Sequence, residues 1–346
     1  MDAVPLVARA RSRLEAQGDG NAGLASDVAG DMSRVVVATA YGGPEVLTVV
    51  DEPTGAPAPG EVTVEVRASG VNPVDYKVYS GKRGADPRRL PLRLGFEAAG
   101  VVTAVGPDAA GPAGPLAVGD EVIAYRVTGA YAAELVVPAQ ALVPKPASLS
   151  WPEASGLMLA GVTAWHALAA TDVGAGDTVL VHGAAGGVGL MAIQLAVDRG
   201  ATVIGTASSA RHNLVREFGA IPVAYGDGLA DRVRATAPHG VTAALDLVGT
   251  DEAVDVSLEL VADRGRIATI AAAQRGLQVG IKVLGGAPGA DPGTQIREAA
   301  RLKLAELTKQ GKLRVLVART FPLESAADAH RLSMDGHVSG KIALIP

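Results

Sequence analysis

A glycine-rich segment near the middle of the chain places the strongest constraint on the fold. An apolar run at 178–182 is followed by four glycines within seven residues and then by a second apolar run at 190–196. This order predicts a buried strand, a tight turn and a helix that begins at the turn, the arrangement that binds the pyrophosphate of a dinucleotide. Ala184 stands in the first glycine position of the fingerprint, and Gly186 and Gly189 occupy the other two.

The turn also predicts which residues would contact the cofactor. Gly186 would let the backbone approach the pyrophosphate, and Gly189 would let the helix pack closely on the strand. The first amides of the helix would face the anion, because they lie at the positive end of the helix dipole. We therefore predict a pyrophosphate site formed by Ala185, Gly186, Gly187 and Val188.

The end of the next predicted strand indicates the type of nucleotide. An NAD site usually carries a carboxylate there, which accepts hydrogen bonds from the ribose hydroxyls. The segment 207–212 has no acidic residue but contains Ser208, Arg211 and His212. Because guanidinium is a natural partner for phosphate, this segment predicts NADPH as the cofactor. The alternative interpretation is that Arg211 only begins a solvated helix.

Composition excludes several classes of protein. The chain has 346 residues and no cysteine, so it has no disulfide framework and no thiolate nucleophile or metal ligand. A net charge of −5 and an aromatic content of 3% argue against a dedicated nucleic-acid binder. The stretch 178–197 is long enough to span a bilayer, but its glycines favour a strand, a turn and a helix. We expect a soluble, cytoplasmic protein.

The pattern of strands and helices predicts two domains after a flexible N-terminal extension at 1–31. Residues 32–156 contain short β-branched runs between Gly and Pro turns, which are typical of antiparallel strands. From 157 onward, strands alternate with helices, as in a parallel sheet. Strand-like segments are expected at 178–181, 202–204, 244–247, 266–270, 313–317 and 341–345, and a helix at 296–310. We expect one domain at 32–156 and 294–346, and a second at 157–293.

Several further motifs follow one another in a fixed order. They occupy residues 42–47, 70–75, 95–100, 160–164, 246–249 and 340–344. Together they resemble the zinc-independent medium-chain dehydrogenases/reductases of the quinone oxidoreductase (ζ-crystallin-like) family, over about residues 33–346. In the third motif, Phe96 stands where the zinc enzymes carry a histidine ligand.

The resemblance implies an α/β fold with a GroES-like β domain, a doubly wound Rossmann domain that binds NADPH, and a C-terminal segment that returns to the first domain. It places Asn72, Thr163, Val248 and Ala271 around the nicotinamide. It also places Ser208 and Tyr225 beside the 2′-phosphate. His212 stands where some relatives have lysine, so phosphate binding would depend on pH. Relatives usually form homodimers through an edge of the Rossmann sheet, for which 280–284 is the candidate.

The lack of zinc ligands limits the chemistry. A zinc ion polarises the substrate oxygen in zinc dehydrogenases, but this chain has no cysteine and has Phe96 at the histidine position. The expected reaction is therefore hydride transfer from NADPH to an electron-poor acceptor, either a quinone or an α,β-unsaturated carbonyl compound. The six histidines show no metal-ligand spacing, and His330 and His337 are expected at the surface.

Four residues are candidates for catalysis. Asn72 would donate its amide hydrogen to the acceptor oxygen or else cap the loop before Pro73. Asp75 would act as an acid or base or else stabilise a turn. Tyr76 and Tyr131 would donate a proton or else pack in the core.

Two further functions stay open. One is a pathway-specific enoyl reductase of secondary metabolism, for which the loop 285–293 would shape a dedicated pocket or form a plain surface loop. The other is a structural or regulatory protein that binds NADPH with little turnover. Tight NADPH binding without turnover would favour the latter.

Overall fold

The computed structural model describes residues 32–82 and 84–346. The extension predicted at 1–31 lies outside the described residues. These residues belong to one compact unit, which has two parts.

Two sheets form the first part of this unit. A three-stranded sheet has the order β2-β1-β4, and a larger sheet of seven strands has the order β10-β8-β5-β3-β18-β17, with β9 also paired to β3. The β-branched residues of β1 and β3 are buried on both faces of the strand. In β1, Val36 packs in one apolar cluster, and Val35 and Val37 pack in another on the opposite face. The strands are β1 (Met32–Ala38), β2 (Leu47–Pro53), β3 (Glu61–Val71), β4 (Leu92–Arg93), β5 (Glu97–Val105), β8 (Glu121–Tyr125), β9 (Glu134–Pro138), β10 (Leu142–Pro144), β17 (Val317–Pro322) and β18 (Lys341–Ile345).

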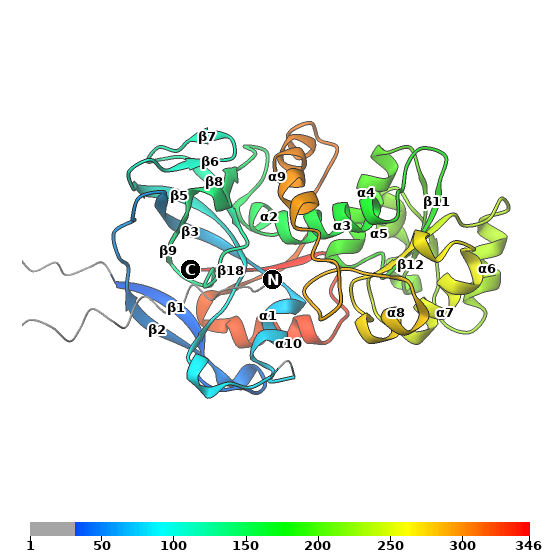
Figure 1. The fold of residues 1–346 in the computed structure, drawn as a ribbon, viewed down its shortest axis with the longest axis horizontal. Coiled ribbons are helices and arrows are strands. Elements are labelled where there is room, and N and C mark those ends of the chain that lie inside the picture. The colour runs from blue at the N-terminus through cyan, green and yellow to red at the C-terminus, as the bar shows by residue number, and fades with distance from the viewer. Residues whose placement is uncertain (1–31, 83) are drawn as a thin grey trace, which may run out of the picture. The chain divides into compact units, whose positions relative to one another are not determined.

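The C-terminal strand returns to this larger sheet, as expected. β18 runs antiparallel to β3, with Ile342 opposite Val71 and Ala343 opposite Gly70, and parallel to β17. In Figure 1 the red end of the chain accordingly lies beside the blue β3. This pairing brings Lys341 next to residues that stand far earlier in the sequence.

A six-stranded parallel sheet forms the second part. Its order is β13-β12-β11-β14-β15-β16, which is the doubly wound order of dinucleotide-binding domains. The carboxyl ends of the central strands therefore meet at one edge, where such sheets bind their ligands. The strands are β11 (Thr178–His182), β12 (Thr202–Thr206), β13 (Ile221–Val223), β14 (Ala243–Asp246), β15 (Ile267–Thr269) and β16 (Lys282–Val283).

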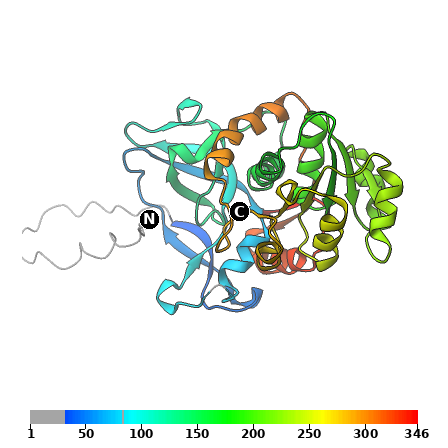
Figure 2. The ribbon, with the colours of Figure 1, turned by 45° about the vertical axis from the view of Figure 1, so that its right-hand side comes forward.

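Helices join the two parts and cover their sheets. α3 and α9 lie side by side in both ribbon views (Figures 1 and 2). The largest apolar cluster runs from Ile123 of β8 through Leu157 and Leu168 to Leu245 of β14, so one core crosses the domain boundary predicted at 157. That boundary and the one at 294 stay predictions. The helices are α1 (Pro73–Tyr79), α2 (Trp151–Ser155), α3 (Met158–Ala170), α4 (Gly187–Asp198), α5 (His212–Glu217), α6 (Leu229–Thr236), α7 (Asp251–Leu260), α8 (Ala273–Val279), α9 (Thr294–Lys309) and α10 (Ala326–Met334).

The strand predicted at 313–317 is wrong, because β17 begins only at Val317. Leu313 and Val315 are buried, which explains the apolar pattern. The amide of Arg314 donates to Oε1 of Gln194 on α4 instead of to a neighbouring strand.

The apolar run at 280–284 contains the edge strand β16. Asp291 covers part of this edge, because its amide donates to the carbonyl oxygen of Val283 at 2.8 Å. The homodimer stays a prediction from the family resemblance.

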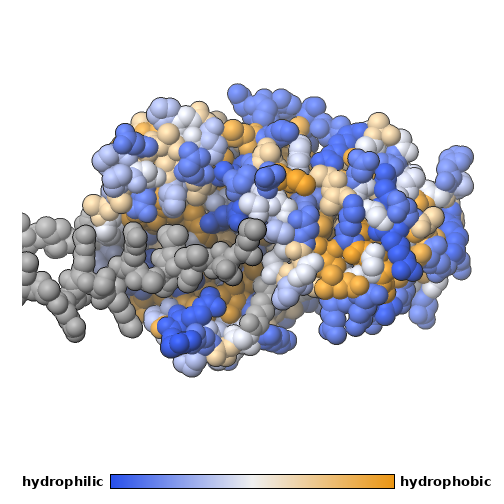
Figure 3. Space-filling view, in the orientation of Figure 1, coloured by the Kyte–Doolittle hydropathy of each residue, from blue (hydrophilic) through white to orange (hydrophobic). Residues whose placement is uncertain are grey.

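Polar residues cover most of the face shown in Figure 3, with apolar patches between them. In the part of the chain that the structure describes, no helix is both long and apolar enough to cross a bilayer. The glycine-rich stretch at 178–197 is a strand, a turn and a helix, as predicted.

Candidate functional site

The glycine-rich turn joins β11 to α4. Leu190 is the first residue of α4 whose amide bonds back to the turn, to the carbonyl oxygen of Gly186 at 2.9 Å. Within residues 32–82 and 84–346, the amide of Val188 has no hydrogen-bond partner, whereas the amide of Gly187 faces the carbonyl oxygen of Gly340 in a parallel β-bridge. The start of a helix is a site for an anion, because its first amides lie at the positive end of the helix dipole.

The two glycines of the fingerprint have different surroundings. A Cβ on Gly189 would lie 2.4 Å from the carbonyl oxygen of Gly183, so the helix fits on the turn only with a glycine there. A Cβ on Gly186 would meet no atom closer than 3.4 Å. The outer side of the turn is therefore open, and a phosphate group fits against its backbone.

The start of β18 lies directly against this turn. The amide of Gly340 donates to the carbonyl oxygen of Ala185 at 3.1 Å. A Cβ on Gly187 would lie only 2.9 Å from Cδ of Lys341. The C-terminal strand thus holds the turn in place and brings a positive charge close to it.

Lys341 belongs to a buried polar cluster with Glu97 and Asn72. Its ammonium group pairs with Oε1 of Glu97 at 3.1 Å and also donates to Oδ1 of Asn72. The Asn72 side chain donates to Glu97 at 2.9 Å and to the carbonyl oxygen of Gly70 at 3.3 Å. Oε2 of Glu97 accepts from the amide of Leu159 at 2.7 Å. The side-chain hydrogens of Asn72 are thus engaged within the protein, which suits a positioning role.

A second buried network begins at Asp75 and contains Tyr131, both catalytic candidates. The Tyr131 hydroxyl donates to Oδ2 of Asp75 at 2.7 Å, and Nε2 of His330 lies 3.1 Å from the Tyr131 oxygen. The Tyr79 hydroxyl lies 2.8 Å from Nδ1 of His330. Because Tyr131 gives its hydrogen to Asp75, His330 donates from Nε2 and accepts from Tyr79 at Nδ1. The same oxygen of Asp75 accepts from the amide of Asn72 at 2.6 Å, which ties the two networks together.

The prediction that His330 lies at the surface is wrong, because this residue is fully buried. It stands on the face of α10 that also carries Ala326 and Ala329, and this face packs on the sheet. Burial lowers the pKa of His330 to about 4, so the imidazole is neutral. His337 is exposed.

Burial raises the pKa of Asp75 to about 7, although the hydrogen bonds from Tyr131 and Asn72 and the charge of Lys341 act against this rise. Glu97 is the nearby negative charge that adds to it. The folded protein thus holds the Asp75 proton more tightly than the unfolded chain does. The contribution of Asp75 to stability therefore falls as the pH rises from about 4 to about 7.

We expect Asp75→Asn to stabilise the protein more at pH 8 than at pH 5, because the variant has no carboxylate to ionise. At about 1.4 kcal/mol per pKa unit, the free energy of unfolding should gain about 3 kcal/mol more at pH 8. Chemical denaturation of both proteins at the two pH values measures this difference. An equal effect of the substitution at pH 5 and pH 8 would contradict the assignment.

The residues predicted to bind the 2′-phosphate follow β12 and β13. The amide of Ala184 donates to the carbonyl oxygen of Thr206 at 3.0 Å, which fixes the end of β12 beside the turn. Ser208 and Arg211 come directly afterwards and are partly exposed. Arg211 contacts Ser339 and donates to the carbonyl oxygen of His337 at 2.7 Å.

Two more predicted residues lie near the same strand end. His212 lies with Nε2 at 3.3 Å from the carbonyl oxygen of Ala207. Tyr225 follows β13 and is 55% exposed, so its ring is accessible to a ligand.

Val248 and Ala271 follow the adjacent strands β14 and β15. Asp246 accepts from the amides of Val248 and Gly249, at 3.1 and 2.7 Å. A Cβ on Gly249 would lie 2.9 Å from Cβ of Ala271, so the two loops are in contact. These residues therefore lie together at the carboxyl edge of the parallel sheet.

The last two predicted residues lie elsewhere. Thr163 is on α3, where its hydroxyl accepts from Arg297 at 3.3 Å. Tyr76 is half-buried beside the apolar cluster around Tyr79, and burial raises its pKa. Sequence reasoning assigned no role to Glu97, Lys341 or Arg297. The first two stood within recognised motifs, whereas Arg297 had no such signal.

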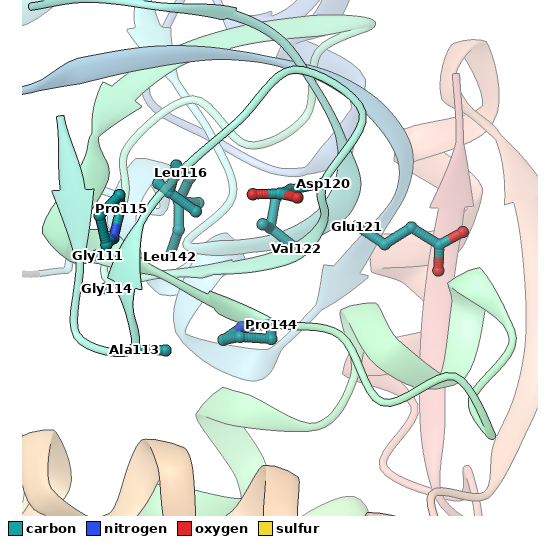
Figure 4. A pocket seen from close by; sticks show the side chains of 10 residues that line it. All are labelled: Gly111, Ala113, Gly114, Pro115, Leu116, Asp120, Glu121, Val122, Leu142 and Pro144. Carbon is teal, nitrogen blue, oxygen red and sulfur yellow. The ribbon is translucent and has the colours of Figure 1, made fainter.

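A hollow of about 180 Å³ lies beside the hairpin of β6 (Ala110–Gly111) and β7 (Gly114–Pro115). Figure 4 shows that Glu121 points away from the other lining side chains. Glu121 pairs with Lys145 at 2.9 Å, and Asp120 accepts from the amide of Ala117 at 2.8 Å. Since both carboxylates are engaged, the hollow offers no reactive group.

The comparisons with known proteins agree with this architecture. Residues 58–147 match the alcohol dehydrogenase GroES-like domain, and residues 218–344 match the zinc-binding dehydrogenase family. The quinone oxidoreductase of Pseudomonas aeruginosa is 34% identical over 91% of this chain and 100% of its own. A 2-haloacrylate reductase of Burkholderia is also 34% identical, over 88% and 96%. The Escherichia coli quinone oxidoreductase, solved with NADPH, superposes with a TM-score of 0.78 at 29% identity, over 91% of this chain and 100% of that one.

The fold and the site thus define a medium-chain oxidoreductase. The chain belongs to the zinc-independent quinone oxidoreductase family. Although one matching family is described as zinc-binding, Phe96 replaces the histidine ligand and no cysteine is present. Among the described residues, no three His, Asp or Glu side chains are grouped to hold a metal ion.

Proposed function

We propose that the protein uses NADPH to reduce a quinone or an α,β-unsaturated carbonyl compound. The observation that carries this proposal is the open turn at the start of α4, next to a strand end that has an arginine and no carboxylate. The turn suits a pyrophosphate, and Arg211 suits the additional phosphate of NADPH. The Escherichia coli relative was solved with NADPH, which supports the choice of cofactor.

The residues of the site would divide the binding of NADPH between them. The first amides of α4 hold the pyrophosphate, and Ser208 and Arg211 hold the 2′-phosphate. Bound NADPH supplies a hydride, and one proton completes the reduction, so that acceptor, NADPH and H⁺ give the dihydro product and NADP⁺. Asn72, Asp75 and Tyr131 keep the active-site loop in place, because their polar hydrogens are engaged inside the protein.

The choice of acceptor follows from the groups that the site lacks. With no cysteine and with Phe96 at the histidine position, the chain lacks the ligands by which zinc dehydrogenases hold the metal that polarises an ordinary ketone. Quinones and conjugated carbonyl compounds accept a hydride without such help. The names of the Pseudomonas and Burkholderia relatives, a quinone oxidoreductase and a 2-haloacrylate reductase, fall in these two classes.

A panel of acceptors tests the reaction. NADPH and NADH oxidation should be measured with 1,4-benzoquinone, 9,10-phenanthrenequinone, an alkenal and a crotonyl thioester. Faster turnover of quinones or the alkenal with NADPH supports the proposal. Turnover of the thioester alone would instead indicate an enoyl reductase. Tight NADPH binding without turnover would indicate a structural or regulatory protein.

We expect Arg211→Gln to raise the KM for NADPH by roughly 10- to 100-fold, the size of one charge-assisted hydrogen bond to phosphate. The KM for NADH should change less than about threefold, because NADH has no 2′-phosphate. Steady-state kinetics with both cofactors measures the two effects. Arg216→Gln is the matched control, since Arg216 is exposed and its side chain bonds only to Asn213 among the described residues. An equal loss for NADPH and NADH would contradict the assignment.

A further inference from the structure

Arg297 lies near the start of α9 and makes contact only with uncharged groups of neighbouring elements. Its Nε donates to Nδ1 of His166, and its Nη1 donates to the hydroxyl of Thr163, both at 3.3 Å. Tyr125, at the end of β8, lies near it, and while burial raises the pKa of this phenol, the charge of Arg297 opposes the rise. Arg297 is half-buried, whereas Tyr125 and Thr163 are almost fully buried. Arg297 therefore lies beside two buried hydroxyl groups and is itself partly exposed.

Glu298, the residue after Arg297, forms ion pairs with other arginines. Glu298 pairs with Arg126 at 3.4 Å and also with Arg301. No carboxylate in residues 32–82 or 84–346 lies within 4.0 Å of the Arg297 guanidinium. Its charge therefore has no direct counter-ion in this part of the chain.

Asp291, which lies in the loop before α9, is also engaged. It bonds to Nε2 of His166 at 3.2 Å and accepts from the amide of Gly293 at 2.8 Å. Burial and the charge of Arg297 both lower the pKa of His166, so this imidazole is neutral and accepts at Nδ1. A Cβ on Gly293 would lie 2.3 Å from the His166 ring, so the loop packs flat against it. The surroundings thus hold Arg297 in place without a direct ion pair, although, together with the hydrogen bond from the amide of Gly293, its charge lowers the pKa of Asp291.

Contacts connect Arg297 with the phosphate-binding turn. Tyr125 stands opposite Glu97 in the pairing of β5 with β8. Glu97 binds Lys341, which lies against Gly187 of the turn. A chain of packed residues therefore links the turn with Tyr125, the neighbour of Arg297.

The position of α3 indicates which half of the cofactor would lie near Arg297. In a sheet of this order, the adenosine ribose of a dinucleotide lies at the end of the strand that follows the turn and its helix, here β12. α3, which carries Thr163, contacts β15, on the other side of β11 from β12. Arg297 therefore lies on the side of the nicotinamide, where the acceptor must bind.

We propose that Arg297 binds a carboxylate of the acceptor, so that the protein prefers anionic conjugated carbonyl compounds. This proposal rests on the proposed function and narrows its substrate class. A guanidinium binds a carboxylate through two charge-assisted hydrogen bonds, which are stronger than its contacts at 3.3 Å with neutral groups. On binding, the acceptor replaces the hydroxyl of Thr163 as a partner of Arg297.

Two acceptors that differ in charge test the proposal. 3-Benzoylacrylate and its methyl ester share the same conjugated double bond, but only the acid is an anion. We expect Arg297→Gln to lower kcat/KM for the acid by roughly 10- to 100-fold, the size of one or two charge-assisted hydrogen bonds. The loss for the ester should be less than about threefold.

Two further variants separate charge recognition from structure. Arg297→Lys keeps the charge but loses the planar pair of donors, so it should restore part of the preference for the acid. Arg126→Gln removes a neighbouring exposed charge and should leave the ratio of the two acceptors unchanged within about twofold. Equal losses of acid and ester in Arg297→Gln would overturn the proposal and assign Arg297 a structural role.

A second experiment tests the Arg297 subsite when the proposed reaction itself is not observed. If neither acceptor is reduced, calorimetry with the saturated acid 3-benzoylpropionate and its methyl ester, in the presence of NADP⁺, still tests the subsite. Binding of the acid that weakens at least tenfold in Arg297→Gln, with the ester little affected, supports the subsite alone. Equal binding of the acid to both proteins overturns it.

Discussion

Replacing Gly186 with valine should abolish NADPH binding and leave the folded protein intact. Gly186 has φ −74° and ψ 170°, an extended conformation that a β-branched residue adopts readily. A Cβ there would meet no protein atom closer than 3.4 Å. We expect the methyl groups instead to occupy the space in which the pyrophosphate would approach the turn. Loss of the charge-assisted hydrogen bonds to the pyrophosphate should weaken NADPH binding roughly 100-fold or more, equivalent to about 3 kcal/mol.

Gly189→Val is the matched control, since the same side chain is added three residues later. A Cβ at that position would lie 2.4 Å from the carbonyl oxygen of Gly183 and 2.6 Å from that of Ala184. We therefore expect this variant to lower the melting temperature strongly, whereas Gly186→Val should shift it little. Fluorescence titration with NADPH and thermal melting measure the two effects. A Gly186→Val protein that binds NADPH normally would show that the pyrophosphate does not lie against this turn.

The turn could be predicted because its geometry is local. A strand, four glycines and a helix follow one another within residues 178–198, and the close packing at Gly189 involves only the neighbouring residues Gly183 and Ala184. The short antiparallel strands and the change to strands that alternate with helices after residue 157 are also local patterns in the sequence. Short-range periodicity records these features directly.

The buried networks could not be predicted, because their members meet only through the topology. Tyr131 and His330 are 199 residues apart, and Glu97 and Lys341 are 244 apart. His330 shows the consequence, since a histidine among small residues near the end of the chain reads as a surface residue. Only the packing of α10 on the sheet, beside Tyr79, reveals that it is buried.

Arg297 illustrates a second limit. A single arginine in an amphipathic helix looks like one of many solvated charges, and α9 contains Arg301, Lys303 and Lys309 as well. The difference arises from the partners of these charges. Glu298 neutralises Arg301, whereas Arg297 faces hydroxyls and a neutral imidazole from other elements. Sequence spacing does not record such pairing, so the candidate subsite emerged only from the three-dimensional contacts.

The buried pair of Glu97 and Lys341 should give the largest effect on stability. Glu97 is fully buried and Lys341 is 5% exposed, so removal of either charge leaves the other without compensation in a region of low dielectric. We expect Glu97→Gln and Lys341→Met each to lower the free energy of unfolding by about 3–5 kcal/mol. Chemical denaturation measures both values.

The double variant Glu97→Gln with Lys341→Met distinguishes an ion pair from two independent losses. If the charges depend on each other, the double variant should be more stable than the sum of the single losses predicts, by about 2 kcal/mol or more. The exposed pair of Arg34 and Glu324 is the control, where Glu324→Gln should cost less than about 1 kcal/mol. Additive losses at Glu97 and Lys341 would mean that each residue acts through its other hydrogen bonds. Coupling would instead show that the C-terminal strand is held by this charge, and with it the lysine that lies against the cofactor turn.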